Sequence, residues 1–215
     1  MVYGMITITK LGTKVSKQSQ GLESLRTKFN QSDCILLPQL FDQQILNLIK
    51  KRLHQSLFQE RNHTGIGVEL CLEDKVAVNT LNLLMNNQEI FDFIQKVTGC
   101  IPIGNFSGRV YRFNPTTKHH DSWHDDLVKH RIISISVNLS EQPYSGGILQ
   151  IRKRQTEQII HEVANVGFGD AIVFRLSEQL QHRVTNVVGD HPKTAFAGWF
   201  SSQPDFRTFL KQSSV

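Results

Sequence analysis

The chain has 215 residues, of which 39% are hydrophobic and 20% charged, and its formal net charge is +5 at pH 7. This length fits one domain, and the hydrophobic content is too high for a disordered or low-complexity chain. The densest basic runs, Lys50 to Arg52 and Arg152 to Arg154, are not interleaved with aromatic residues that could stack on bases. No nucleic-acid partner is therefore predicted.

The cysteines and the hydropathy pattern indicate the cellular compartment of the protein. Cys34, Cys71 and Cys100 are far apart and odd in number, which favours a reducing compartment over a disulfide framework. No run approaches the roughly 20 apolar residues of a membrane span, and the start lacks the pattern of a secretory leader. We expect a cytoplasmic protein with no membrane segment, and the sequence leaves the oligomeric state open.

The N-terminal part is predicted to be an arm followed by helices. Residues 1–32 are polar and weakly periodic, which indicates a peripheral strand or a loosely held arm, and residues 33–215 are predicted to form one domain. Within that domain, residues 33–100 form a helical layer. Its first helix follows a possible cap at Asp42 and places apolar residues at helical spacing. These residues are Leu46, Ile49, Leu53 and Leu57.

A second helical stretch follows roughly from Val76 to Thr98. The pattern predicts a break near Asn86 and Asn87 and a stop at Gly99. Ile90, Ile94 and Val97 form one apolar stripe, which indicates packing against a core.

From Ile101 the period of the pattern changes to two. Short strand-like runs follow one another up to residue 201 with turn residues and no long helix between them, and residues 202–215 remain as a C-terminal tail. Such strands pair antiparallel and close into two packed sheets or a barrel. The predicted fold class is α+β, with a double-stranded β-helix (jelly-roll) core and N-terminal helices packed on the larger sheet.

A cluster of histidine and aspartate follows the first long strand. His119, His120 and His124 lie beside Asp121, Asp125 and Asp126. In an extended segment, residues i and i+2 point to the same side, so His124 and Asp126 can present an imidazole and a carboxylate to one ion. His182 could be brought alongside by an antiparallel sheet. Two histidines and one carboxylate are the ligand set of non-haem Fe(II) oxygenases, although such a cluster can also be a simple polar loop.

A lysine in the last strand strengthens the metal interpretation. Lys193 lies eleven residues after His182 and shares a strand face with Ala195, Ala197 and Trp199. Small side chains beside a cation leave room for a charged ligand. A small dicarboxylate would fit this description.

The sequence at this point resembles the 2-oxoglutarate and Fe(II)-dependent oxygenases, in particular their prolyl 4-hydroxylase-like branch. The resemblance covers about Arg109 to Ser201. It rests on Tyr111, WHDD, RIISISVNLS, YSGG, GFGDAIVF and HRVTNVVGDHPKTAFAGWF, in the expected order.

The resemblance implies a set of site residues and cofactors. It implies Fe(II) at His124, Asp126 and His182, 2-oxoglutarate held by Lys193 and Tyr111, and dioxygen as the oxidant. The pair His119 and Asp121 is a rival for the first two ligands, because the interval between Tyr111 and His124 is longer than usual. WHDD resembles the family pattern more closely, so His124 and Asp126 are preferred.

The resemblance further implies an enzyme that hydroxylates an unactivated C–H of an amino acid, a peptide or a peptide-like natural product. Trp123, Arg183 and Trp199 are candidates for contact with that small-molecule or peptide substrate. The N-terminal arm and the stretch Glu60 to Lys75 are candidate lid segments, and the sequence does not decide between them. One alternative keeps the cofactors but leads to desaturation or cyclisation of a small metabolite. Another is a cupin-like module that binds metal without turnover, which the Lys193 anchor argues against.

Overall fold

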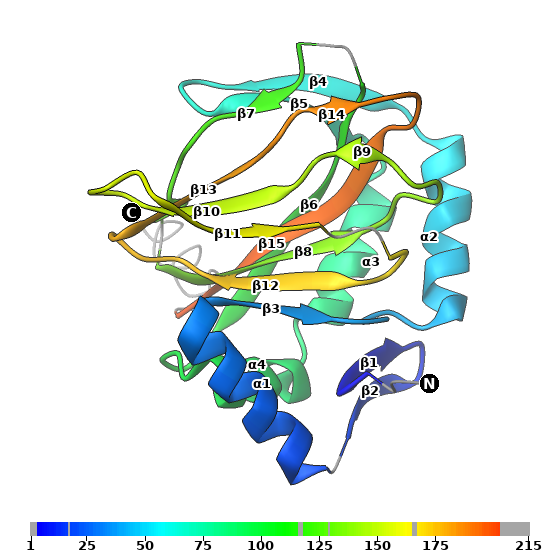
Figure 1. Ribbon diagram of the computed structural model, residues 1–215. Coiled ribbons are helices and arrows are strands. Elements are labelled where there is room, and N and C mark those ends of the chain that lie inside the picture. The colour runs from blue at the N-terminus through cyan, green and yellow to red at the C-terminus, as the bar shows by residue number, and fades with distance from the viewer. Residues whose placement is uncertain (1–3, 17, 116–117, 129, 165–166, 203–215) are drawn as a thin grey trace, which may run out of the picture.

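A computed structural model describes residues 4–16, 18–115, 118–128, 130–164 and 167–202. The described chain forms a helical layer, a large antiparallel sheet and a small sheet opposite it (Figure 1). Every strand pairing within the large sheet and within the small sheet is antiparallel, and the described residues after 100 contain no crossover helix. The predicted double-stranded β-helix is confirmed.

The large sheet has the strand order β3-β12-β8-β15-β6-β5-β4, with β7 also paired to β5. β15 lies in its centre between β6 and β8. The strands are β3 (Cys34–Leu37), β4 (Phe58–His63), β5 (Gly67–Leu72), β6 (Asn105–Phe113), β7 (His120–Asp121), β8 (Arg131–Asn138), β12 (Ala171–Arg175) and β15 (Lys193–Ser201).

The small sheet faces the inner side of the large one. It has the order β11-β10-β13, and a short pair of β9 with β14 continues it. Apolar side chains of the two sheets, among them Leu149, Ile151, Ile172 and Phe174, pack together between them. The strands are β9 (Ser145–Gly146), β10 (Leu149–Lys153), β11 (Ile159–Val163), β13 (Leu180–Val184) and β14 (Val187–Val188).

The helices α2, α3 and α4 begin and end near the predicted signals, whereas α1 was not predicted. They are α1 (Ser19–Ser32), α2 (Gln43–Gln55), α3 (Lys75–Met85) and α4 (Gln88–Thr98). The Asp42 carboxylate caps α2 by accepting a hydrogen bond from the Ile45 backbone N–H at 2.8 Å. The predicted break separates α3 from α4 at Asn86 and Asn87, and Gly99 ends α4 in the left-handed region at φ 66°. Leu57 was expected on the apolar stripe of α2 but lies beyond the helix and is 75% exposed.

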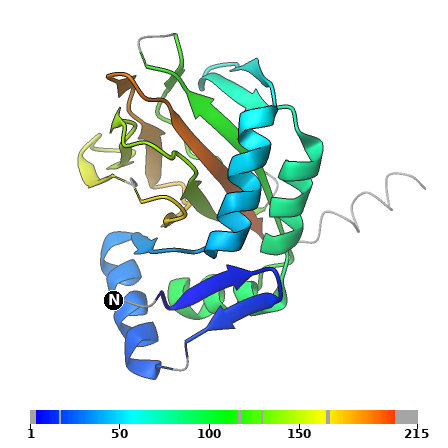
Figure 2. The ribbon, with the colours of Figure 1, turned by 90° about the vertical axis from the view of Figure 1, so that its right-hand side faces the viewer.

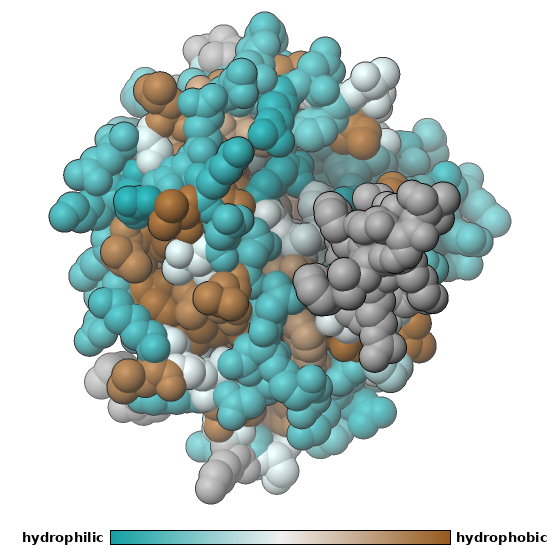
Figure 3. All heavy atoms as spheres, turned by 180° about the vertical axis from the view of Figure 1, so that it is seen from behind, coloured by the Kyte–Doolittle hydropathy of each residue, from teal (hydrophilic) through white to brown (hydrophobic). Residues whose placement is uncertain are grey.

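The helices cover the outer face of the large sheet, and this interface is the main hydrophobic core. Figure 2 shows α2 and α3 lying across the sheet. Apolar side chains of α2, α3 and α4 meet the outward side chains of β6, β8 and β15, of which Phe106, Phe196 and Phe200 are the largest. Figure 3 shows the molecule from behind, where the surface is mostly hydrophilic and apolar side chains gather in one area. On α3, the side chains of Val76 and Leu83 are exposed.

Residues 1–32 were expected as a peripheral strand or loosely held arm. The segment lies at the edge of the molecule (Figure 1), but it contains a hairpin of β1 (Ile6–Thr9) with β2 (Gly12–Val15), followed by α1. Three of its apolar residues, Ile6, Ile8 and Phe29, are fully buried in the main core. They hold the segment in place although its composition is polar. The predicted C-terminal tail lies outside the described residues, except for Ser202.

Among the described residues, every helix is too short or too polar to cross a bilayer. Cys34, Cys71 and Cys100 are all free thiols.

Candidate metal centre and its cavity

Two segments far apart in the sequence meet at the open end of the sheets. The loop after β7 runs beside β13, and His124 and His182 form an isolated antiparallel bridge. The His124 N–H donates to the His182 carbonyl at 3.1 Å, and the His182 N–H donates to the His124 carbonyl at 2.8 Å. Because residues opposite each other in an antiparallel pair point to the same face, both imidazoles point into the molecule.

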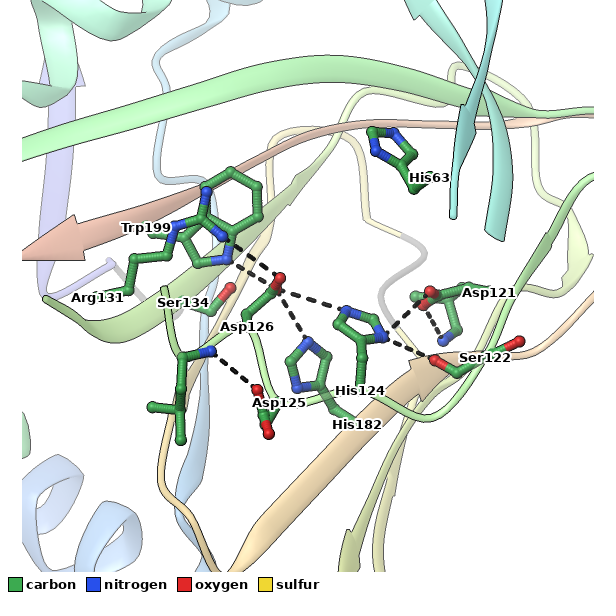
Figure 4. A network of polar contacts seen from close by, with 12 residues as sticks. His63, Asp121, Ser122, His124, Asp125, Asp126, Arg131, Ser134, His182 and Trp199 are labelled. Carbon is green, nitrogen blue, oxygen red and sulfur yellow. Dashed lines mark hydrogen bonds and ion pairs between the residues drawn. The ribbon is translucent and has the colours of Figure 1, made fainter. Parts of the chain in front are cut away.

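Asp126 joins the two histidines. Its Oδ2 lies 3.5 Å from His124 Nε2 and 3.3 Å from His182 Nε2, and the two imidazole centroids are 4.3 Å apart (Figure 4). The Asp126 backbone has φ 56°, in the left-handed region that aspartate tolerates better than most residues. This conformation turns the chain after His124, so the carboxylate faces the imidazoles.

The three groups fit a metal ion. Ligands that share one ion at about 2.1 Å and at right angles lie about 3 Å from each other. The contacts from Asp126 to the two imidazoles are close to this spacing, and one donor atom from each residue lies within 4.8 Å of the others. Two imidazoles with one carboxylate suit Fe(II).

Neighbouring groups orient His124 for metal binding. Its Nδ1 lies 2.7 Å from the Ser122 carbonyl and 3.4 Å from Asp121 Oδ1 (Figure 4). A carbonyl can only accept, so Nδ1 carries the proton and a neutral imidazole keeps its Nε2 lone pair for an ion. Asp121 Oδ2 also accepts from the Val184 N–H at 2.8 Å, which ties this carboxylate to β13.

The charges of the three groups stabilise one another. Burial disfavours the charged form of His124, but the carboxylates of Asp126 and Asp121 outweigh it and raise the pKa of His124 to about 9. Burial likewise disfavours the charged form of Asp126, but the two histidines hold its pKa well below the usual range. The carboxylates of Asp126 and Asp121 therefore favour positive charge at the position of His124.

The rival pair is separated by the fold. His119 is buried away from the other two histidines: its Nδ1 accepts from the Asn114 N–H at 3.1 Å, and its ring stacks on Phe113. Asp121 lies behind His124, on the side away from Asp126 (Figure 4). The geometry favours His124 and Asp126 over His119 and Asp121.

Lys193 lies buried in the same cavity, which has a volume of about 380 Å³. Its Nζ donates to the Tyr144 hydroxyl at 3.0 Å and to the Gly147 carbonyl at 2.9 Å. Among the described residues no carboxylate pairs with this ammonium, and burial lowers its pKa to about 8. A buried cation without an anion is costly, so the site fits an anionic ligand.

Gly147 is needed where it stands. It has φ 60°, and an added Cβ would lie 2.9 Å from Lys193 Cδ and 2.9 Å from the Tyr144 ring. The double glycine of YSGG therefore lets the backbone approach the lysine closely.

Tyr111 and Trp199 also line the cavity. Burial, followed by the nearby carboxylates, raises the pKa of Tyr111, so its hydroxyl stays protonated and can donate. Trp199 Nε1 donates to Asp126 Oδ2 at 2.8 Å (Figure 4). Trp199, predicted to contact substrate, thus also orients the carboxylate.

Two arginines flank Trp199 at the mouth of the cavity. The Arg131 Cζ lies 3.6 Å from the centroid of the Trp199 ring, and the Arg109 Cζ lies 5.1 Å from it. Arg109 is ion-paired with Glu69, which comes from the hairpin of β4 and β5 and also accepts from His63 Nε2 at 2.9 Å. One of the two segments predicted as candidate lids is this hairpin, which extends the large sheet and lines one side of the cavity.

Trp123 and Arg183 do not line the cavity. Trp123 directly precedes His124, and Arg183 directly follows His182. Because neighbours in an extended chain point to opposite faces, both side chains point away from the cavity, and the Arg183 Cζ lies 4.5 Å from the centroid of the Trp123 ring. The expectation that both contact substrate at the mouth of the site stays a prediction.

Several groups escaped the sequence analysis. Tyr144 and Gly147 bind Lys193, Asp121 orients His124, and Glu69 fixes Arg109. The motif YSGG marked the first two by its turn glycines. No periodicity or spacing identified Glu69, because its partner Arg109 lies forty residues further along the chain.

Comparisons with known proteins agree with this geometry. Residues 108–201 match the family model described as 2OG-Fe(II) oxygenase superfamily. A comparison with curated protein sequences finds no significant match.

Solved structures share the fold. A prolyl-4-hydroxylase from Pseudomonas putida is 17% identical with a TM-score of 0.61, and the match covers 85% of this chain and 99% of that one. A Trichoplax adhaerens prolyl hydroxylase, solved with a hypoxia inducible factor oxygen degradation domain peptide fragment, is 13% identical with a TM-score of 0.64, covering 88% and 94%. The alpha ketoglutarate dependent epimerase SnoN from nogalamycin biosynthesis is 12% identical with a TM-score of 0.62, covering 85% and 83%.

Proposed function

We propose that this protein hydroxylates an unactivated C–H of an amino acid, peptide or peptide-like natural product. The proposal starts from the match of residues 108–201 to the 2OG-Fe(II) oxygenase superfamily, oxidoreductases that use Fe(II), 2-oxoglutarate and dioxygen. In the balanced reaction, 2-oxoglutarate, dioxygen and R–H give succinate, carbon dioxide and R–OH. The catalytic unit is residues 33–215, with residues 1–32 at its edge.

We assign His124, Asp126 and His182 as the Fe(II) ligands. Three ligands on one side of an ion leave its other positions for the cosubstrate and dioxygen, and the bound metal supplies the oxidising chemistry. The residues of the chain hold this arrangement. Ser122 and Asp121 fix the tautomer of His124, and Trp199 and Arg131 hold the carboxylate of Asp126.

We assign Lys193 as the anchor of the distal carboxylate of 2-oxoglutarate, with Tyr111 as a hydroxyl donor to the same molecule. The single observation that carries the proposed function is that the two-histidine, one-carboxylate group and a buried lysine with no acidic partner among the described residues line one cavity. A module that only bound metal would have no use for this ammonium, and burying it would destabilise the fold.

The mouth of the cavity suits a substrate with both apolar and polar groups. Ile66 and Val128 line its edge, together with Arg109, Arg131 and Trp199. A peptide or an amino acid has such a mixture. The peptide seen with the Trichoplax protein supports a peptide-like substrate here, through likeness of fold alone.

The experiment is succinate formation from 2-oxoglutarate by the full chain with Fe(II), under air and under nitrogen, with amino acids, peptides and metabolites as substrates. We expect dioxygen-dependent succinate that increases with a true substrate, and a product that has gained one oxygen atom. The control is the His182→Ala variant. Dioxygen-dependent succinate from this variant at the rate of the unsubstituted chain would contradict the ligand assignment, and none from the unsubstituted chain would contradict the function.

The epimerase among the similar folds makes a second outcome worth measuring. The same cofactors would then desaturate or cyclise a small metabolite. A product that has lost two hydrogen atoms, with succinate formed in equal amount, would favour this alternative over hydroxylation.

A further inference from the structure

The loop that carries His124 and Asp126 has a second face. Trp123 precedes the first histidine and points outward, over the outer face of the small sheet. The Cζ atoms of Arg152 and Arg183 lie 4.4 Å and 4.5 Å from the centroid of the Trp123 ring. Both distances are within the range of attractive cation–π contacts.

The sheet register explains this stack. Gln150 lies opposite Arg183 and Arg152 opposite Gln181, so these four side chains share the outer face of β10 and β13. The bridge from His124 to His182 places Trp123 opposite Arg183. The residues on the inner face of the same segments are Ile151, His182 and His124.

Hydrogen bonds hold both guanidinium groups in place. Arg152 donates from Nε and Nη2 to Gln181 Oε1, at 2.9 and 2.7 Å. Arg183 donates from Nε to Gln150 Oε1 at 2.8 Å. Because the arginines are oriented by strands of the sheet, the indole is held against a fixed surface and not against two mobile side chains.

The loop has few other attachments to β13. Among the described residues from 121 to 126, these are the two hydrogen bonds of the His124–His182 bridge, the bond from the Val184 N–H to Asp121, and the contact of Asp126 with His182. On the outer face, Asp125 also pairs with Arg154, but both groups are substantially exposed and contribute less.

We propose that Trp123 is a positioning residue for the metal centre. It clamps the loop onto the small sheet through Arg152 and Arg183, so that His124 and Asp126 face His182 at ligand spacing before the ion binds. This inference rests on the proposed function. Without the clamp, the loop separates from β13 more easily and the ligands must be ordered when the metal binds, which weakens affinity.

The test is the dissociation constant of Mn(II), an oxidation-resistant stand-in for Fe(II), measured calorimetrically on the metal-free full chain. We expect Trp123→Ala to weaken Mn(II) binding about 10- to 100-fold, the range found when groups behind metal ligands are removed. Trp123→Phe keeps an aromatic face and should recover most of the affinity. Lys153→Ala removes an exposed cation from the same strand and should leave it unchanged.

The double variant Arg152→Met, Arg183→Met keeps the indole and removes both cations, so it tests the clamp even where Trp123→Ala does not fold. We expect weaker Mn(II) binding from it than from Lys153→Ala. Mn(II) affinity within twofold of the unsubstituted chain, in folded Trp123→Ala or in the double variant, overturns the clamp. An unsubstituted chain that binds no Mn(II) contradicts instead the proposed metal site.

Discussion

The two faces of the large sheet contrast sharply along β15. Phe196 and Phe200 point outward, are fully buried and pack under the helices. Lys193, Ala197 and Trp199 alternate with them and point inward, where they line the cavity. One strand therefore supplies the core with one set of residues and the site with the other.

The difference lies in what each face packs against. On the outer face, aromatic rings interlock: the centroids of Phe106 and Phe200 are 4.9 Å apart, and those of Phe106 and Phe196 are 5.7 Å apart. On the inner face, Ala195 and Ala197 leave space for a ligand. We infer that folding free energy comes mainly from the outer face, and that inward substitutions change binding more than stability.

The largest expected effect is on the inner face, at Asp126. Asp126→Ala removes the group that both imidazoles contact, so we expect Mn(II) binding and 2-oxoglutarate turnover to fall more than 100-fold, with the domain still folded. Calorimetry for the metal and succinate formation check this. The exposed Asp190→Ala is the matched control. A variant that still turned over 2-oxoglutarate at a tenth of the normal rate would place the carboxylate ligand elsewhere.

On the outer face of the large sheet, we expect a substitution to lower stability and to leave metal binding unchanged. Phe196→Ala leaves a cavity among fully buried rings, and we expect the free energy of unfolding to fall by about 3–5 kcal/mol. Denaturant titration measures this loss. Leu11, which is 98% exposed, gives the control: Leu11→Ala should change the free energy of unfolding by less than about 0.5 kcal/mol. Folded Phe196→Ala should bind Mn(II) normally, and weak binding by the folded variant would contradict the separation of the two faces.

This contrast also explains what the sequence could predict. Alternation along KTAFAGWF places residues on two faces of a strand, and the Asn86–Asn87 break and Gly99 stop are local backbone preferences. His124, Asp126 and His182 could be proposed as ligands because their residue types and the H-x-D spacing are visible in the sequence. Such features need only neighbours in the sequence.

Contacts between distant polar residues could not be predicted in this way. The strand β4 has the sequence FQERNH, which alternates poorly, so the hairpin that brings Glu69 to Arg109 was expected only as a candidate lid within a helical layer. The direction of Trp123 depended on the antiparallel bridge at His124, which forms only once the loop docks on β13. Which polar side chains meet across the sheet depends on the strand register in the folded chain, and amino-acid composition does not predict that register.

A smaller effect is expected at Lys193. If Lys193 is the proposed anchor, Lys193→Ala would remove a charge-assisted hydrogen bond to 2-oxoglutarate, and we expect the Michaelis constant for 2-oxoglutarate to rise about 10- to 100-fold. Mn(II) affinity should remain within about threefold, because the lysine is no ligand. Lys193→Arg should retain more activity than Lys193→Ala, since the charge survives although its geometry differs. Equal loss of metal binding in Lys193→Ala would contradict the assignment of an anchor.

The smallest expected effect is a pH dependence that isolates the charge of Lys193. Burial lowers its pKa from the ordinary 10.5 to about 8 in the folded chain without ligand. Between these two values the unfolded chain binds more protons, so the contribution of this lysine to stability rises with pH.

The affinity for 2-oxoglutarate is expected to change with pH in the opposite direction. The dianion would bind the ammonium form of Lys193, so above pH 8 its binding must first restore the proton of this lysine. We expect the dissociation constant of 2-oxoglutarate, measured by calorimetry with Mn(II) bound, to rise about tenfold between pH 7 and pH 9. Lys193→Arg should show a nearly flat profile over this range, since its guanidinium stays charged. Parallel profiles for the two proteins would assign the pH dependence to another group and remove Lys193 as its source.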